Sequence, residues 1–86
     1  MYVILVYDIN QKRVSKMLRL CRKYLHWIQN SVFEGELTPS KLDELKSRAN
    51  KIMQDTDSLI IFKMRQEKWV EKEIVGEERS STDTML

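Results

Sequence analysis

Asp8 is the residue of this sequence whose type and position are best suited to chemistry. It follows six residues of the apolar segment Tyr2–Ile9, where a carboxylate either ends the strand and helps to cap the next helix or lines a site at the end of the sheet. Mg²⁺ prefers oxygen ligands and usually keeps several waters, so one carboxylate is too few for a magnesium site. Metal binding therefore requires a dimer axis near Asp8, across which two carboxylates share one cation.

A second group suited to chemistry is a basic segment on a chain with a net charge of only +2. Residues 10–33 contain no acid and six cations: Lys12, Arg13, Lys16, Arg19, Arg22 and Lys23. Such a segment either binds the phosphates of a nucleic acid or is an ordinary solvated helix face. Arg13 follows Asp8 by five residues, so it can approach the same end of the sheet.

Aromatic side chains provide a third candidate group, because they can stack on bases. The candidates are Tyr7, Trp27, Phe33 and Trp69. Most aromatic residues of a small domain belong to its core, and we expect Trp27 and Phe33 to be the two that face outward.

The sequence lacks the residues that other common catalytic and binding sites require. The only glycines are Gly35 and Gly76, which excludes a glycine-rich phosphate loop. One histidine, His26, and one cysteine, Cys21, exclude disulfides and cysteine-based zinc sites, and give no plausible nucleophile–histidine pair. Cys21 lies in an apolar stripe, which indicates a core position.

The first elements are predicted by periodicity. Tyr2–Ile9 is apolar on both faces, as in a central strand covered on both sides. Asn10 is a suitable helix cap. Residues 11–25 form one apolar helical stripe of Val14, Met17, Leu18, Cys21 and Leu25, with the cations on the opposite side.

The second half of the chain repeats this alternation. Residues 26–37 have β character and are divided at Asn30, and Gly35 marks a bulge or a turn. Thr38 and Pro39 begin a helix that continues to Met53. Asp57–Met64 is a further strand, and the alternation of Trp69–Val75 predicts a last one.

The order β-α-β-β-α-β predicts an α+β, ferredoxin-like domain over residues 1–79, with an additional C-terminal strand at about 69–75 and a frayed tail at 80–86. The fourth strand then lies at a sheet edge, although Leu59–Phe62 is a poor sequence for an exposed edge. We expect Trp69–Val75 to cover this edge, from its own chain or from a partner's. A chain of 86 residues is marginally stable alone, which favours a homodimer.

The sequence gives no sign of a membrane protein. The longest apolar run, Val3–Tyr7, is far shorter than the roughly 20 residues of a transmembrane helix, and the N-terminus has no signal-peptide pattern. We expect a soluble, cytoplasmic protein without a membrane partner.

The sequence resembles the small CRISPR-associated protein two family, the partner of the CRISPR integrase in spacer acquisition. The matching elements are residues 6–9 (VYDI), Arg13–Val14, residues 28–35 (IQNSVFEG), and Asp57 leading into Leu59–Phe62. The resemblance covers about residues 1–76. It is specific because the VYDI and IQNSVFEG elements occur together at the separation typical of the family.

The resemblance implies a prokaryotic, ferredoxin-like homodimer whose C-terminal strand packs on the partner's sheet. The family's metal-binding aspartate corresponds to Asp8, so the implied cofactor is one Mg²⁺ shared by two Asp8 residues. The other implied catalytic residues are Tyr7, Arg13, Ser31 and Phe33. Some members have an arginine where this chain has Trp27, and His26 or Arg22 would replace it.

The resemblance also implies a function. Members are described as magnesium-dependent nucleases of single-stranded RNA or duplex DNA, and they bridge two integrase dimers while holding duplex DNA on basic surfaces. Two alternatives stay open: a non-catalytic DNA-binding adaptor of the integrase, and a toxin-like ribonuclease of the same fold. Whether the chain is an enzyme is therefore left open by its sequence.

Overall fold

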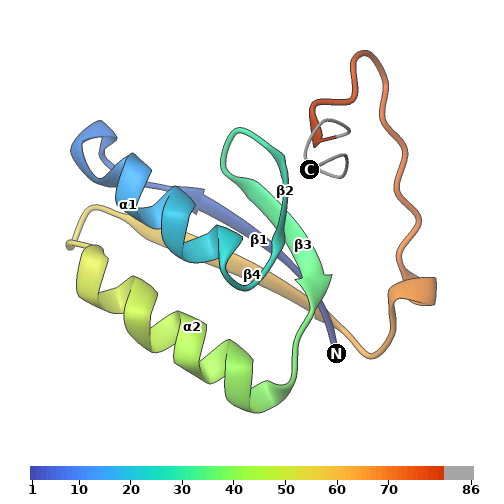
Figure 1. The fold of residues 1–86 in the computed structure, drawn as a ribbon, viewed down its shortest axis with the longest axis horizontal. Coiled ribbons are helices and arrows are strands. Elements are labelled where there is room, and N and C mark those ends of the chain that lie inside the picture. Colours follow the sequence, from blue (N-terminus) through green and yellow to red (C-terminus); the bar gives the residue numbers. More distant parts are fainter. Residues whose placement is uncertain (81–86) are drawn as a thin grey trace.

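Two helices and four strands alternate along the chain in the computed structural model, which describes residues 1–80 (Figure 1). The elements are β1 (Tyr2–Asp8), α1 (Gln11–Arg22), β2 (His26–Gln29), β3 (Val32–Glu36), α2 (Pro39–Ile52) and β4 (Ser58–Met64), followed by a 3₁₀ turn at Glu67–Trp69. This order confirms the predicted ferredoxin-like α+β fold. The tail predicted for 80–86 falls outside the described residues from position 81 onward.

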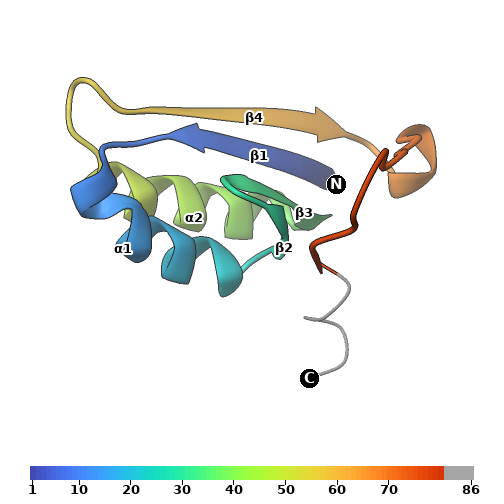
Figure 2. The same cartoon turned by 90° about the horizontal axis from the view of Figure 1, so that it is seen from above.

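The four strands form one antiparallel sheet in the order β2-β3-β1-β4. The strand β4 is an edge strand, as predicted, and β1 lies in the interior. Leu5 is opposite both Phe33 of β3 and Ile61 of β4. Both helices pack on the same face of the sheet, which Figure 2 shows nearly edge-on. None of the helices within residues 1–80 is long and apolar enough to cross a bilayer.

The predicted helix starts and the predicted strand break are confirmed. The side chain of Asn10 accepts a hydrogen bond from the Lys12 N–H at 2.9 Å. Thr38 Oγ1 accepts one from the Lys41 N–H at 3.1 Å, and Pro39 takes the first helical position. Asn30 adopts a left-handed φ of 45° between β2 and β3.

Gly35 does not form the predicted bulge or turn. It is paired with Val3 inside β3, and the register shift lies instead between Trp27 and Gln29 of β2. A Cβ atom at position 35 would lie 3.1 Å from Leu25 Cδ2. Glycine is therefore favoured at this position because the chain after α1 packs closely against β3.

The face of the sheet that the helices cover, here called the helical face, contains the core. The side chains of Val3, Leu5 and Tyr7 point to this face and are 5% exposed or less. Phe33 is fully buried there, and Met17 and Leu45 from the two helices complete the same cluster. Burial of this apolar surface is the main stabilising contribution within a single chain.

The opposite face, here called the open face, is only partly covered. Alternation along the strands places Ile4 and Val6 of β1 on it, paired with Phe62 and Ile60 of β4. Ile60 and Phe62 are 53% and 54% exposed, so the expectation that the central strand is covered on both sides is met on the helical face alone. We call these four residues the open-face strip.

The predicted strand at Trp69–Val75 is absent from the described chain. Trp69 lies in the 3₁₀ turn, and residues 70–75 adopt no regular structure because no neighbouring strand pairs with them. They run beside β2 and β3 rather than along β4, and line a cavity of about 390 Å³ with Ile28 and Val32 (Figure 1). The segment therefore leaves the β4 edge of its own chain uncovered.

One ion pair joins this C-terminal segment to the open face. Lys72 Nζ forms a short contact with the carboxylate of Glu34, which also accepts a hydrogen bond of 2.6 Å from the Tyr2 hydroxyl. Burial alone would raise the pKa of Glu34, but the Lys72 ammonium and the Tyr2 hydroxyl together hold it below its usual value. The carboxylate is therefore ionised at neutral pH and binds the segment electrostatically.

Candidate functional site

Asp8 lies at the carboxyl end of β1 and is exposed to solvent. It is paired with Ser58 in the register that also pairs Val6 with Ile60, so its side chain belongs to the open face. No hydrogen bond or ion pair with a residue of the described chain engages its carboxylate. Asp8 is thus a free anion next to an uncovered apolar surface.

The loop that follows Asp8 is fixed by a second carboxylate, Asp57. Arg13 donates two hydrogen bonds to it, from Nε to Oδ2 and from Nη2 to Oδ1, both at 2.9 Å. The backbone N–H groups of Gln54 and Asn10 donate two more, at 2.9 and 3.0 Å. These four donors, the Gln54 N–H foremost, lower the pKa of Asp57.

This arrangement changes the interpretation of Arg13. Its guanidinium lies at the same end of the sheet as Asp8, as expected, but it is bound to Asp57, whose side chain is only 1% exposed. Arg13 therefore holds the start of α1 against the loop before β4. Sequence analysis missed the positioning role of Asp57 because a contact across 44 residues leaves no local signal.

The aromatic residues of the predicted site lie in the core. Phe33 is fully buried rather than outward-facing, and its ring stacks on that of Tyr7 with centroids 6.0 Å apart. Burial raises the pKa of Tyr7. Both rings are buried because the strand register places them on the helical face, against α1 and α2. Ser31 is half-buried in the turn between β2 and β3, and its carbonyl accepts a hydrogen bond from the Tyr7 N–H.

The described part of one chain does not assemble a metal site by itself. Within residues 1–80 no three histidine, cysteine, aspartate or glutamate side chains come together in a way that could hold an ion. Asp8 supplies an oxygen ligand that is exposed and unpaired, which fits a site completed by a second copy. It does not fit a site closed within the monomer.

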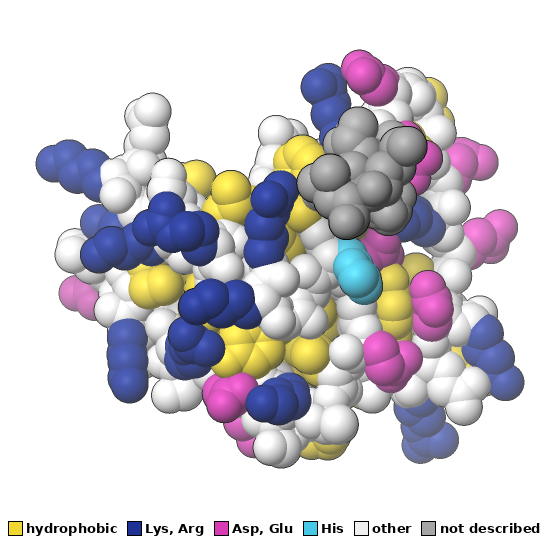
Figure 3. Space-filling view, in the orientation of Figure 1, with side chains coloured by type: hydrophobic (Ala, Val, Ile, Leu, Met, Phe, Trp, Pro, Cys, Tyr) yellow, Lys and Arg dark blue, Asp and Glu magenta, His cyan; other side chains and the backbone are white. Residues whose placement is uncertain are grey.

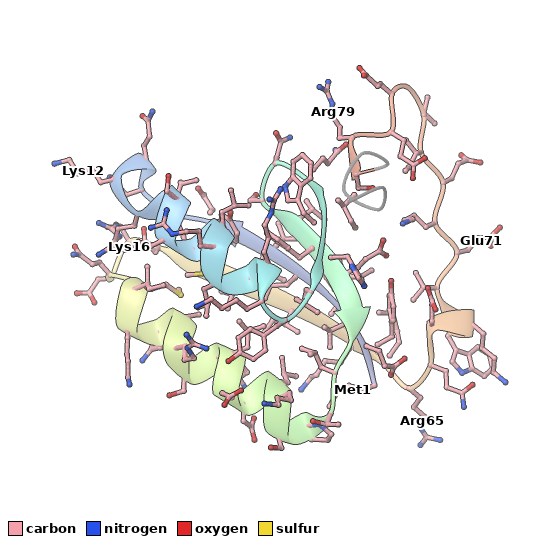
Figure 4. All side chains as sticks on the ribbon, in the orientation of Figure 1. Met1, Lys12, Lys16, Arg65, Glu71 and Arg79 are labelled. Atoms are coloured by element: carbon pink, nitrogen blue, oxygen red, sulfur yellow. The ribbon has the colours of Figure 1, made fainter. Side chains whose placement is uncertain are left out.

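The predicted nucleic-acid-binding residues divide into three groups. Lys16, Arg19 and Lys23 line a groove of about 350 Å³, and Lys12 projects from the first turn of α1 beside Lys16 (Figure 4). Arg13 is bound to Asp57. Arg22 lies with its guanidinium 5.5 Å from the centre of the Trp27 ring, which brings a positive charge to the position where the resemblance implies an arginine.

The opposite wall of this groove is formed by α2, which contributes Arg48 and Lys51. Neither residue was predicted from the sequence. The predicted basic segment is a contiguous run without acids, whereas α2 contains acids as well as cations. Arg48 and Lys51 are three residues apart on one face of α2, although Glu44 lies one turn before Arg48. A search of each helix by face would have found these two cations.

Comparison with known protein families gives a match over most of the chain. The family model described as CRISPR associated protein Cas2 matches residues 1–72. A protein of Dictyoglomus turgidum named CRISPR-associated endoribonuclease Cas2 is 47% identical to this chain, with the whole of both chains aligned. A protein of Thermotoga maritima with the same name is 46% identical, over 92% of each chain.

Solved structures show the same fold. A crystal structure of a Cas2 protein superposes with a TM-score of 0.87 at 42% identity, covering 93% of this chain and 91% of the other. The Streptococcus pyogenes Cas2 crystal structure at pH 6.5 gives a TM-score of 0.71 at 31% identity, covering 84% of this chain and 98% of the other.

Proposed function

Because this chain belongs to the CRISPR-associated protein Cas2 family, we propose that it is a metal-dependent endonuclease that hydrolyses phosphodiester bonds in single-stranded RNA, duplex DNA or both. The observation that carries the proposal is the exposed, unpaired carboxylate of Asp8 on the open face. The names of the relatives, which call them endoribonucleases, support the same class of reaction.

The active form in this proposal is a homodimer. Ile60 and Phe62 are half-exposed on an edge strand, and a second copy that packs against this surface removes them from water. Residues 69–75 of the partner subunit supply the strand that the β4 edge lacks. Because Asp8 shares the open face with the apolar strip, this packing brings both carboxylates to the region between the subunits.

The proposed roles of the residues follow from their positions. Asp8 and Asp8 of the partner subunit hold the Mg²⁺, which when bound supplies an acidified water and neutralises charge on the phosphodiester. The pair of Arg13 with Asp57 keeps the loop after Asp8 in place. Lys16, Arg19 and Lys23 bind phosphates of the substrate and so orient the nucleic acid on the dimer.

A second candidate function is favoured by the basic groove. A non-catalytic adaptor holds duplex DNA through its phosphates and bridges two dimers of the CRISPR integrase, which docks on the C-terminal region. This role needs the cations and not Asp8. The two functions are compatible in one protein, and both belong in the cytoplasm, where the nucleic acids are.

The test is a cleavage assay of the wild type beside Asp8→Asn, on labelled single-stranded RNA and duplex DNA, with Mg²⁺ or with EDTA. The nuclease proposal predicts Mg²⁺-dependent cleavage that Asp8→Asn abolishes, while binding in a gel-shift assay stays unchanged or becomes slightly stronger. Cleavage that persists in the variant contradicts the role of Asp8. Binding without any cleavage supports the adaptor instead.

A further inference from the structure

The groove between α1 and α2 has cations on both of its walls. Lys16, Arg19 and Lys23 come from α1, and Arg48 and Lys51 come from α2. The remaining lining residues are Leu20 and Ile52, so no acid of residues 1–80 lines the groove. Figure 3 shows the Lys and Arg side chains gathered over the two helices, around apolar surface.

Without a bound anion, such a groove has an unfavourable electrostatic free energy. Five like charges around one depression repel each other, and an apolar floor strengthens their combined field relative to that of a flat surface. The repulsion is relieved when negative charges enter between the two walls. The favourable effect of cations near helix C-termini accounts for Lys51 in the last turn of α2, but not for Lys16 near the middle of α1.

The contacts of Arg48 fix the direction of its side chain. Its Nη1 donates to the Tyr24 hydroxyl at 2.8 Å, and its guanidinium lies 5.7 Å from the centre of that ring. Tyr24 in turn donates to Glu44, whose other partner is Lys41. Arg48 is thus oriented by the Tyr24 hydroxyl, and Glu44 interacts with its charge from one turn away without a direct ion pair.

The spacing of the cations along the α1 wall suits a sugar–phosphate backbone. Lys16 and Lys23 are seven residues apart on α1, about 10 Å at roughly 1.5 Å per residue. One strand of a duplex carries a phosphate every 3.4 Å of axis or so, and about three phosphates therefore span the α1 wall. Cations on α2 then contact the same strand from its other side.

We infer that the α1–α2 groove holds the phosphate backbone of a nucleic acid and that Arg48 and Lys51 are binding residues of this protein. The inference rests on the proposed nucleic-acid function and adds a second wall to the interface. Because the groove contacts phosphates alone, binding in it shows little sequence preference and weakens steeply with salt.

The experiment compares the full-length double variant Arg48→Gln/Lys51→Gln with Lys41→Gln/Lys46→Gln. The control pair removes the same charge from the same helix but lies outside the groove lining. Binding is measured by fluorescence anisotropy on a labelled duplex across a salt series. Thermal melting of each variant verifies that it is folded.

The groove variant is expected to bind roughly tenfold more weakly at about 0.15 M salt. Its plot of log affinity against log salt should lose about 0.9 of slope per cation, roughly 1.8 in total. The control pair should change affinity less than about twofold. Arg48→Lys, which keeps the charge, should retain most of the wild-type affinity.

A third double variant, Lys16→Gln/Arg19→Gln, separates this inference from the proposed function. If the α1 pair weakens binding and the α2 pair behaves like its control, nucleic-acid binding stands and the second wall is refuted. If neither pair weakens binding, or the wild type binds no nucleic acid, the proposed interface fails together with the inference. Losses in both groove pairs, with the control pair unaffected, support the inference.

Discussion

The two faces of the sheet differ in how they are completed. On the helical face, Phe33 is fully buried beneath two helices of the same chain. On the open face, Phe62 is 54% exposed, and the C-terminal segment covers only the part formed by β2, β3 and Ile4. The same strands contribute alternate residues to both. The contrast shows that this chain contains one complete core and one partly uncovered apolar face, and that its candidate catalytic residue, Asp8, lies on the uncovered face.

The largest expected effect tests this contrast with the same substitution on both faces. Phe33→Ala removes a fully buried ring and is expected to cost about 3–5 kcal/mol of unfolding free energy, much of the total for a small domain. Phe62→Ala is expected to cost about 1 kcal/mol in the monomer, because its ring is already half in water. Urea unfolding at low protein concentration measures both. Equal losses would contradict the distinction between the faces.

A smaller effect is expected on the dimerisation of the chain. Ile60→Glu places a charge in the open-face strip and is expected to raise the dimer dissociation constant at least about tenfold while the subunit stays folded. Lys63→Glu, which points to the other side of β4, is the control. Sedimentation over a concentration series distinguishes them. An Ile60→Glu protein that dimerises like the wild type would refute the open face as the dimer interface.

A still smaller effect is expected at the attachment of the C-terminal segment. The pKa of Glu34 is lower in the folded chain than in the unfolded one, so its contribution is fully present above the ordinary glutamate pKa and is lost as the pH falls through the folded value. Its loss is expected to cost about 1 kcal/mol, because the Lys72 side chain is 43% exposed and the pair is screened.

Backbone NMR chemical shifts of residues 70–75 report this attachment. These shifts should move toward unfolded-chain values below about pH 4.5 in the wild type, and Glu34→Gln should show the moved values already at neutral pH. A Lys41→Gln protein, which loses a surface pair elsewhere, should behave like the wild type. The ion pair would have no holding role if Glu34→Gln left the shifts unchanged.

Local patterns predicted most of the fold. Asn10 and Thr38 begin helices because their side chains satisfy free backbone N–H groups, and that requirement is visible within three residues of sequence. The edge position of β4 followed from the topology. The helical stripe likewise placed Cys21 in the core, where burial raises the pKa of its thiol to about 12.

What the sequence could not predict depends on contacts between distant segments. The period of two along a strand separates its faces but does not say which face the helices cover, so Phe33 was assigned outward. The alternation of Trp69–Val75 marks residues suited to a strand, yet a strand also needs a neighbour to pair with. The ion pair of Arg13 with Asp57 joins residues 44 positions apart, so no periodicity in the sequence indicates it.

The most direct test of the account is whether two Asp8 carboxylates form one site. Wild-type and Asp8→Asn chains, co-refolded in varying proportions, give dimers in which neither, one or both copies carry the substitution. If the site is shared, Mg²⁺-dependent cleavage follows the square of the wild-type fraction, and an equal mixture retains about one quarter of the wild-type activity. A linear dependence, with about one half retained, would contradict a shared site, because each subunit would then act alone.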